Sequence, residues 1–182
     1  MATGTQQIEW WSQMAAGTRW DDLRFPAQAI NPPGGASDAD VEPTTGLLLF
    51  AGNATEVVFG VAQLPHSWRE GSAIVPHVHW QKTTSASGDV LWQLDYEVVG
   101  NGETAAMDYG SQLQVTSPVA GTPDTDTANN VMISSFGEID MTGQSVSCMV
   151  LWRLSRIGGD EADGYAGDSR LLEFDIHFQV DS

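Results

Sequence analysis

Two histidines separated by a single residue, His77 and His79, are the side chains of this sequence best placed for chemistry. They belong to the segment 64–82, LPHSWREGSAIVPHVHWQK, which also holds His66 and the single lysine of the chain. Alternate side chains of a β-strand point to the same face, so the two imidazoles can reach one ligand. Imidazole is a common ligand of Zn²⁺ and other transition metals. The candidate metal ligands are therefore His77, His79 and His66.

The spacing around these histidines resembles the opening of the first motif of the cupins, which are jelly-roll proteins that bind metals. Gly71, five residues, His77, one residue and His79 match that opening. The motif also requires a carboxylate shortly after the second histidine, and residues 80–84 contain none. The downstream histidine of a second motif is missing as well. A cupin-type metal enzyme is therefore the least favoured interpretation.

The apolar side chains of the same strand favour a structural role for the histidines. Val78 and Trp80 alternate with the two histidines and are expected to face the core, so both imidazoles lie on the opposite face of the strand. We therefore expect polar residues of an outer sheet face, or residues packed against a partner subunit. A three-ligand metal site would have to recruit His66 or His177 together with an acid such as Asp175.

The acidic loop 158–168, GGDEADGYAGD, is a second candidate for ion binding. Carboxylate oxygens are the ligands that Ca²⁺ prefers, and the loop offers them from Asp160, Glu161, Asp163 and Asp168. It lacks the regular alternation of oxygen ligands that an EF-hand loop shows. A solvated loop is therefore favoured over a calcium site.

The rest of the sequence shows no catalytic set. Cys148 is the only cysteine, which rules out an intrachain disulfide, and its apolar surroundings in residues 146–152 predict a buried, inert thiol. Nucleophile elbow, P-loop and cysteine-pair zinc motifs are absent. We therefore expect a protein that is not an enzyme and uses no cofactor.

Strand-like runs separated by turn residues fill the sequence from residue 45 onward. Clean alternation predicts that Trp92 and Leu94 face the core, and that Leu172, Phe174 and Ile176 do so near the C-terminus. The expected strands are 46–51, 56–63, 73–81, 90–99, 111–116, 131–140, 146–157 and 170–180. Eight such runs predict an all-β protein, an antiparallel β-sandwich that is most simply an eight-stranded jelly roll.

The first 44 residues lack the regular strand-like runs of the rest of the chain. They are expected to form an N-terminal arm and linker, ahead of a β-sandwich domain at 45–182. Proline and glycine interrupt residues 26–43 and block regular pairing. The tryptophans ahead of them need burial, on this subunit or on a neighbour. The expected interface residues are Trp10, Trp11, Trp20, Arg24 and Phe25.

The charge of the chain limits its partners. Its 182 residues carry a net charge of −17 with only 7 basic residues, which speaks against binding to nucleic acid or to an anionic membrane. No apolar stretch approaches the ~20 residues of a membrane span, and the first residues lack the basic and apolar regions of a signal peptide. Folding in a reducing cytoplasm is the expectation.

Four segments resemble a group of bacteriophage virion proteins in order and spacing. They are WDDLRFP at 20–26, GLLLF at 46–50, LPHSWREG at 64–71 and PHVHW at 76–80. The resemblance extends over residues 20–99 and is weaker in the closing strands. It implies a jelly-roll structural protein of the particle, located in the virion after assembly in the host cytoplasm, and it carries over no catalytic residues.

Three interpretations of the function stay open. The first is a capsid decoration, or cement, protein that binds the major capsid protein or another virion protein and assembles with itself, most simply as a trimer. The second is a head or tail fibre or receptor-binding module, in which exposed aromatic residues and acidic loops contact a glycan or a host surface. The third, least favoured, is the cupin-type metal enzyme.

Overall fold

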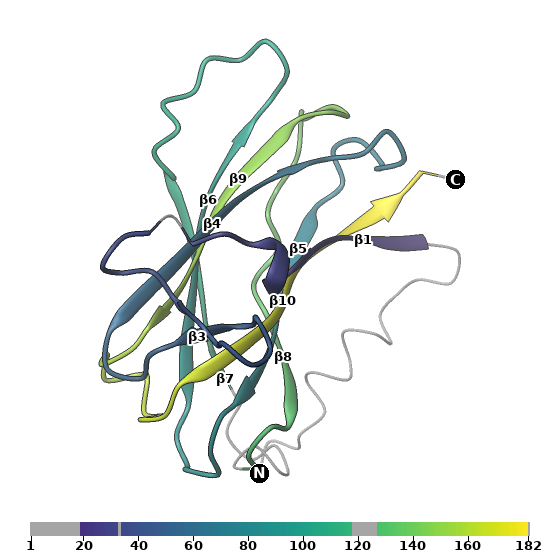
Figure 1. Cartoon of the computed structure of the whole chain (residues 1–182). Helices are drawn as coiled ribbons and strands as arrows, with labels where there is room; N and C mark the ends of the chain where they lie inside the picture. The colour runs from purple at the N-terminus through teal and green to yellow at the C-terminus, as the bar shows by residue number, and fades with distance from the viewer. Residues whose placement is uncertain (1–18, 33, 118–126, 182) are drawn as a thin grey trace.

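The computed structural model describes residues 19–32, 34–117 and 127–181, which form a β-sandwich (Figure 1). No helix in these ranges is long or apolar enough to cross a membrane. Their regular elements are β1 (Arg19–Pro26), η1 (a 3-10 helix, Ala27–Ala29), β2 (Asp40–Val41), β3 (Leu48–Phe50), β4 (Thr55–Gln63), β5 (Ile74–Lys82), β6 (Val90–Val99), β7 (Ser111–Ser117), β8 (Val131–Ser135), β9 (Met149–Ile157) and β10 (Ser169–Val180).

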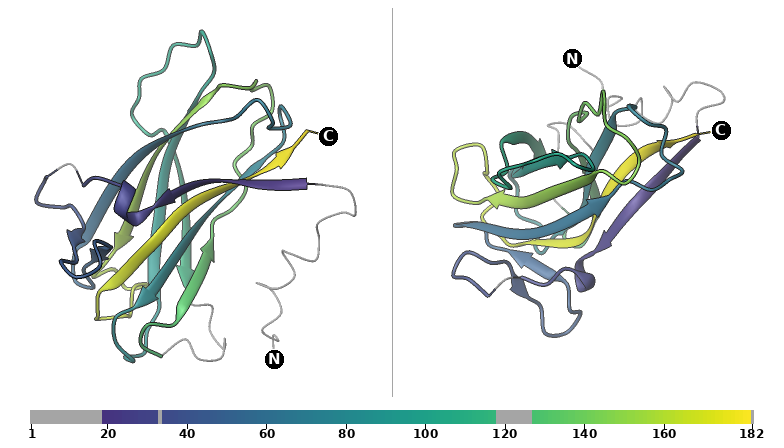
Figure 2. Two further views of the ribbon diagram at one scale, coloured as in Figure 1. Left: turned by 45° about the vertical axis from the view of Figure 1, so that its right-hand side comes forward. Right: turned by 90° about the horizontal axis from the view of Figure 1, so that it is seen from above.

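Two antiparallel sheets pack face to face (Figure 2). Sheet A has the order β2-β3-β10-β5-β8, and β1 also pairs with β10; sheet B has the order β4-β9-β6-β7. Counted from β3, sheet A joins the first, eighth, third and sixth strands, and sheet B joins the second, seventh, fourth and fifth. This is the connectivity of a jelly roll. The predicted fold class is confirmed.

The structure adds two strands, β1 and β2, inside the residues 1–44 that the sequence predicts to be an arm and linker. β1 pairs with β10 along its whole length. Only Leu23 and Phe25 of β1 pack against the core, whereas Asp21 and Asp22 are exposed. Two apolar positions among charged neighbours are too weak a pattern to predict a strand. Here the pairing with β10 decides the local structure.

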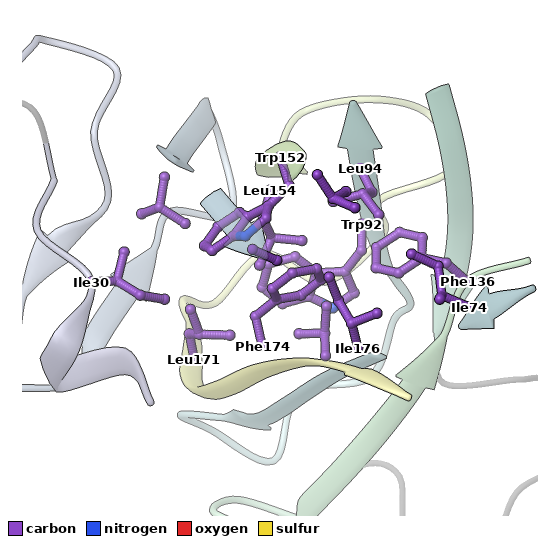
Figure 3. Packing of buried hydrophobic residues seen from close by; sticks show 14 of the residues in the cluster. Ile30, Ile74, Trp92, Leu94, Phe136, Trp152, Leu154, Leu171, Phe174 and Ile176 are labelled. Atoms are coloured by element: carbon purple, nitrogen blue, oxygen red, sulfur yellow. The ribbon is translucent and has the colours of Figure 1, made fainter. Parts of the chain in front are cut away.

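Tryptophan dominates the core between the sheets (Figure 3). Trp80 of sheet A meets Trp92 of sheet B edge to face, with ring centroids 5.8 Å apart. The ring centroid of Trp152, in sheet B, lies 4.6 Å from that of Phe174, in sheet A. Each such ring removes ~150–250 Å² from water. These contacts hold the two sheets together, and they confirm the inward faces predicted for the strands of Trp80 and Trp92.

The alternation predicted for β10 is correct at Phe174 and Ile176 and wrong at Leu172. The register between β10 and β5 shifts between Leu171 and Glu173, which marks a β-bulge. The bulge turns Leu171 into the core and puts Leu172 on the outer side, where it lines a pocket. A bulge arises from pairing with the partner strand, so the alternation within one strand does not reveal it.

Gly60 of β4 gives a test of this packing, because it lies against the ring of Trp152 on β9. A Cβ atom at residue 60 would lie 2.0 Å from Cζ2 of Trp152. Gly60→Ala must displace the ring, and we expect a loss of about 1–3 kcal/mol in the free energy of unfolding, measured with urea. Gly137→Ala is the control, since a Cβ there meets nothing nearer than 3.7 Å. Equal losses in both variants would contradict the packing.

Candidate functional site

Strands β1, β10 and β5 of sheet A run side by side (Figure 1). Carboxylate and imidazole side chains gather on the outer face of these strands. Alternate residues of β10 pack into the core, so the residues between them point outward. Asp175 lies opposite His77 of β5, and His177 lies opposite Asp22 of β1. We call this group the His–Asp cluster; its members are Asp22, His77, His79, Asp175 and His177.

Short polar contacts connect the His–Asp cluster. Nε2 of His79 lies 3.0 Å from Oδ2 of Asp175, and Nδ1 of His77 lies 3.4 Å from Oδ1 of the same carboxylate. Nε2 of His177 lies 2.8 Å from Oδ1 of Asp22. The rings of His77 and His177 are 4.1 Å apart between centroids. The carboxylate of Asp175 is therefore surrounded by imidazoles from β5 and from its own strand.

Asp175 has the most strongly shifted pKa of the cluster. Only 4% of the residue is exposed, and burial by itself raises the pKa of a carboxyl group. The neighbouring imidazoles of His77 and His79 outweigh that burial and lower the pKa of Asp175 from 3.8 to about 2. Asp175 is consequently ionised throughout the neutral range.

The pKa values of the outer histidines move in opposite directions. The hydrogen bond to Asp175 raises the pKa of His79 above its ordinary value of 6.5. Burial, followed by the charge of His77, lowers the pKa of His177, and burial raises the pKa of Asp22. At neutral pH the cluster thus combines a carboxylate at residue 175 with a neutral imidazole at residue 177. These are the protonation states in which both groups bind metals.

An open pocket is lined in part by the cluster and receives residues from β1, β10 and β5. Arg24 closes one side of it and donates from Nε and Nη2 to the carboxylate of Glu173, at 2.5 and 2.7 Å. The pocket is lined by Asp22, Arg24, His79, Leu172, Glu173 and Asp175. Among the described residues, His77, Asp175 and His177 form the one group of three whose metal-ligating atoms all lie within 4.8 Å of one another.

The structure brings together two of the three candidate metal ligands. His77 and His79 share the outer face of sheet A, as the alternation predicts. His66 lies in the loop after β4, where Nε2 is 3.1 Å from Oγ of Ser147, and it takes no part in the cluster. Of the two histidines that a three-ligand site could recruit, His66 or His177, the structure brings His177 to His77, together with Asp175, the acid named as an example. Asp22 is missed, because β1 lacks a recognisable strand pattern.

The predicted interface residues divide into three groups, drawn from Trp10, Trp11, Trp20, Arg24 and Phe25. Trp10 and Trp11 lie outside the described residues. Trp20 is half-buried on β1. Arg24 pairs with Glu173, and the ring of Phe25 lies 5.2 Å from that of Trp152, so both make contacts within this chain. An interface role for these residues stays a prediction.

The acidic loop 158–168 has a structural role that its sequence conceals. Arg156 and Asp163 form an ion pair of 2.7 Å whose side chains are completely buried. Arg156 also donates to the carbonyl oxygens of Phe50, Tyr165 and Gly167. Asp163 is therefore committed to folding the loop and is not a calcium ligand there. The remaining acids of the loop are exposed.

Comparisons with known proteins give only distant likenesses. No protein-family model and no curated protein matches the chain. Latent PorU from Porphyromonas gingivalis aligns at 12% identity and a TM-score of 0.44, over 90% of this chain and 13% of PorU. Tailspike protein 4 of Bacteriophage CBA120 aligns at 8% identity and a TM-score of 0.39, over 88% of this chain and 19% of the tailspike chain.

A third likeness covers both partners almost fully. TmCBM61 in complex with β-1,4-galactotriose aligns at 11% identity and a TM-score of 0.36, over 93% of each chain. By contrast, the chain spans less than a fifth of PorU and of the tailspike chain. Identities of 8–12% and TM-scores of 0.36–0.44 are too low to assign a function.

The pKa of Asp175 generates a prediction about acid stability. Because its pKa is lower in the folded protein (about 2) than its ordinary 3.8, ionised Asp175 stabilises the fold above pH ~4. This contribution, about 2 kcal/mol, is lost as the pH falls through about 2. The titratable and charged groups that face Asp175 are Asp22, Arg24, His77, His79, Glu173 and His177.

We expect His79→Ala to raise the pKa of Asp175, measured by NMR titration of its carboxyl carbon in EDTA. The same variant should lose the stability that protonated His79 contributes below pH ~6.5 and that disappears as the pH rises through its raised pKa. His66→Ala is the matched control, because His66 lies outside the cluster. An unchanged Asp175 titration in the His79 variant would refute the assigned cause.

The buried pair in the acidic loop generates a second prediction. Asp163→Ala leaves the guanidinium of Arg156 buried without its counter-charge, and we expect a loss of ~3–5 kcal/mol in the free energy of unfolding. Asp160→Ala removes an exposed acid of the same loop and should cost less than ~1 kcal/mol. Calcium should leave the Tm of the wild-type protein unchanged. If calcium raises the Tm of the wild-type protein and Asp163→Ala abolishes that rise, the loop binds calcium through Asp163 and the prediction is wrong.

Proposed function

We propose that this chain is a structural protein of a bacteriophage particle. Its most economical role is that of a capsid decoration protein, a jelly-roll body that clamps neighbouring capsid subunits and assembles with itself as a trimer. The observation that supports this proposal most directly is where the segments that resemble phage virion proteins lie in the fold. Residues 20–26, 46–50 and 76–80 fall on β1, β3 and β5 of sheet A. Two of these strands pair directly with β10 on one side, and β5 pairs with it on the other.

The fourth resembling segment, residues 64–71, closes the end of the same sheet. Trp68 is completely buried and bridges to Val180, and the amide of Arg69 donates to the carbonyl of Gln179 at 2.8 Å. Each of the four segments contributes to the core or packs against it, through Phe25, Phe50, Trp68 and Trp80. A resemblance that includes these core residues supports a shared structural role.

The surface charge supports attachment by apolar contact. All six arginines lie in the described ranges, and four of them pair with acids of this chain. Lys82, the only lysine, is buried beneath the ring of Tyr165. Most of the positive charge is thus paired with acids of the same chain, and the outer surface is left strongly acidic. Such surfaces repel one another unless salt screens them.

Exposed valines on the edges of the sheets offer that apolar contact. Val61 of β4 and Val131 of β8 are 50% and 56% exposed. β8 is an edge strand of sheet A, and β4 is an edge strand of sheet B. Edge strands are where neighbouring chains can add contacts. These edges are suited to lateral contact between subunits in a shell.

A receptor-binding module is the second candidate, and the outer face of sheet B favours it. The guanidinium of Arg153 lies 5.4 Å from the ring centroid of Tyr109, and the ring of Phe59 lies 6.2 Å from that ring. Asp95, beside them, receives hydrogen bonds from Gln93 and Gln112. Aromatic rings next to polar hydrogen-bonding groups are a surface type that suits sugars. Copy number separates this role from the first.

Mass spectrometry of purified particles tests the proposal directly. A decoration protein should be present in many copies per head, whereas a fibre or receptor-binding module should be present in a few. We also expect the particles to retain the protein in 1 M NaCl, where the Debye length is only ~3 Å. Release by 1 M NaCl with retention in dilute buffer would show that charge, and not apolar burial, holds it. Absence from the particle would overturn the proposal.

Charged substitutions at the exposed valines give a sharper prediction. Val61→Glu and Val131→Glu should leave the Tm nearly unchanged, because both side chains are exposed in the isolated chain. Each should weaken binding to particles about tenfold, since burying a valine contributes ~1.5 kcal/mol or more. Thr55→Glu and Gln63→Glu add the same charge at exposed positions of β4. Equal binding by the valine variants and these controls would exclude the valines from the contact.

A further inference from the structure

We propose that His77, Asp175 and His177 form a binding site for a divalent transition metal, best suited to Zn²⁺, on the outer face of sheet A. The site goes beyond the structural role proposed above and does not depend on it. Its ligands come from two adjacent strands, β5 and β10, which are paired antiparallel through this region. Paired strands hold side chains more precisely than loops do.

The spacing of the donor atoms fits a tetrahedral ion. Ligands at ~2.0–2.1 Å from a tetrahedral Zn²⁺ are ~3.3 Å apart. Nδ1 of His77 and Oδ1 of Asp175 are separated by 3.4 Å, which is longer than a good hydrogen bond and close to that ligand spacing. The ligating atoms of all three residues lie within 4.8 Å of one another. On metal binding, the ligating nitrogen of the third ligand, His177, would move to the same spacing.

The groups around the three ligands resemble the supporting shell of a zinc site. A histidine that binds a metal usually donates its other ring N–H to a carboxylate. Nε2 of His177 makes such a contact with Asp22, at 2.8 Å. His79 occupies Oδ2 of Asp175 at 3.0 Å, which leaves Oδ1 for the metal. Asp22 and His79 therefore act as positioning residues.

Burial and charge supply an independent observation. Oδ1 of Asp175 is buried and accepts no hydrogen bond of normal geometry. A buried carboxylate oxygen in that state carries a cost that a bound cation would remove. Two imidazoles and one carboxylate select Zn²⁺ over Ca²⁺ and Mg²⁺, which prefer oxygen ligands alone. Water would complete a four-coordinate ion.

Metal binding by the full-length chain tests the site without reference to the particle. Metal is removed from the protein with EDTA and dialysis, and the protein is then titrated with ZnCl₂. The bound metal is measured by inductively coupled plasma mass spectrometry. We expect one Zn²⁺ per chain and a rise in Tm that MgCl₂ does not produce. Co²⁺ should give the visible absorption of a four-coordinate site. Wild-type protein that stays folded but binds no Zn²⁺ would overturn the proposal.

Variants separate the ligands from the supporting residues. His177→Gln and Asp175→Asn should abolish stoichiometric binding, and Asp22→Asn should weaken it ~10–100-fold. His66→Gln is the matched control, since this histidine lies outside the cluster, and it should bind as the wild type does. Retention of Zn²⁺ by the His177 variant, or its loss in the His66 variant, would place the metal elsewhere.

The wild-type protein provides a readout that does not depend on variants folding. The ring nitrogens of all histidines are followed by ¹⁵N NMR during the Zn²⁺ titration. The signals of His77 and His177 should move together and saturate at one equivalent, while those of His66 stay in place. If only exposed histidines respond, and do so without saturating, binding is non-specific and the site is refuted.

Discussion

The pairing of β10 with strands on both sides is the constraint on which the rest of this structure depends. β10 contacts β5 along one edge and β1 and β3 along the other, so it joins segments from both ends of the chain. Its inner face supplies Phe174 and Ile176 to the core. Its outer face supplies Asp175 and His177 to the His–Asp cluster. One strand thereby couples the packing of the sandwich to the chemistry of its surface.

Different interactions stabilise the two faces of sheet A. The inner face is held by aromatic burial, which is non-directional and tolerates the register shift at Leu171. The outer face is held by directional contacts among imidazoles and carboxylates, which require a defined register. An ion bound by His77 and Asp175 would bridge β5 to β10 and reinforce the pairing at the centre of the sheet.

The acidic composition shapes both the interior and the surface. With 24 acidic and 7 basic residues, the chain cannot pair most of its charges. The buried pair of Arg156 and Asp163 uses one of the few cations to anchor an acidic loop, where a missing partner would be costly. Arg170 likewise ties Glu42, in the segment before β3, to β10. What remains outside is negative charge, which favours partners that offer apolar contact, or screening by salt.

The amino-acid pattern alone was enough to predict the eight strands of the sandwich and the outward direction of His77 and His79, because both follow from alternation within one strand. It also named His177 as one of two histidines, with His66, that a three-ligand site could recruit, together with an acid such as Asp175. The assembled sheets were needed to show that β1 is a strand, that Asp22 reaches His177, and that Asp163 pairs with the guanidinium of Arg156. Each of these depends on a partner more than a hundred residues away or on a buried ion pair. Local pattern carries no information about such partners, since the free energy that selects them arises only when the sheets assemble.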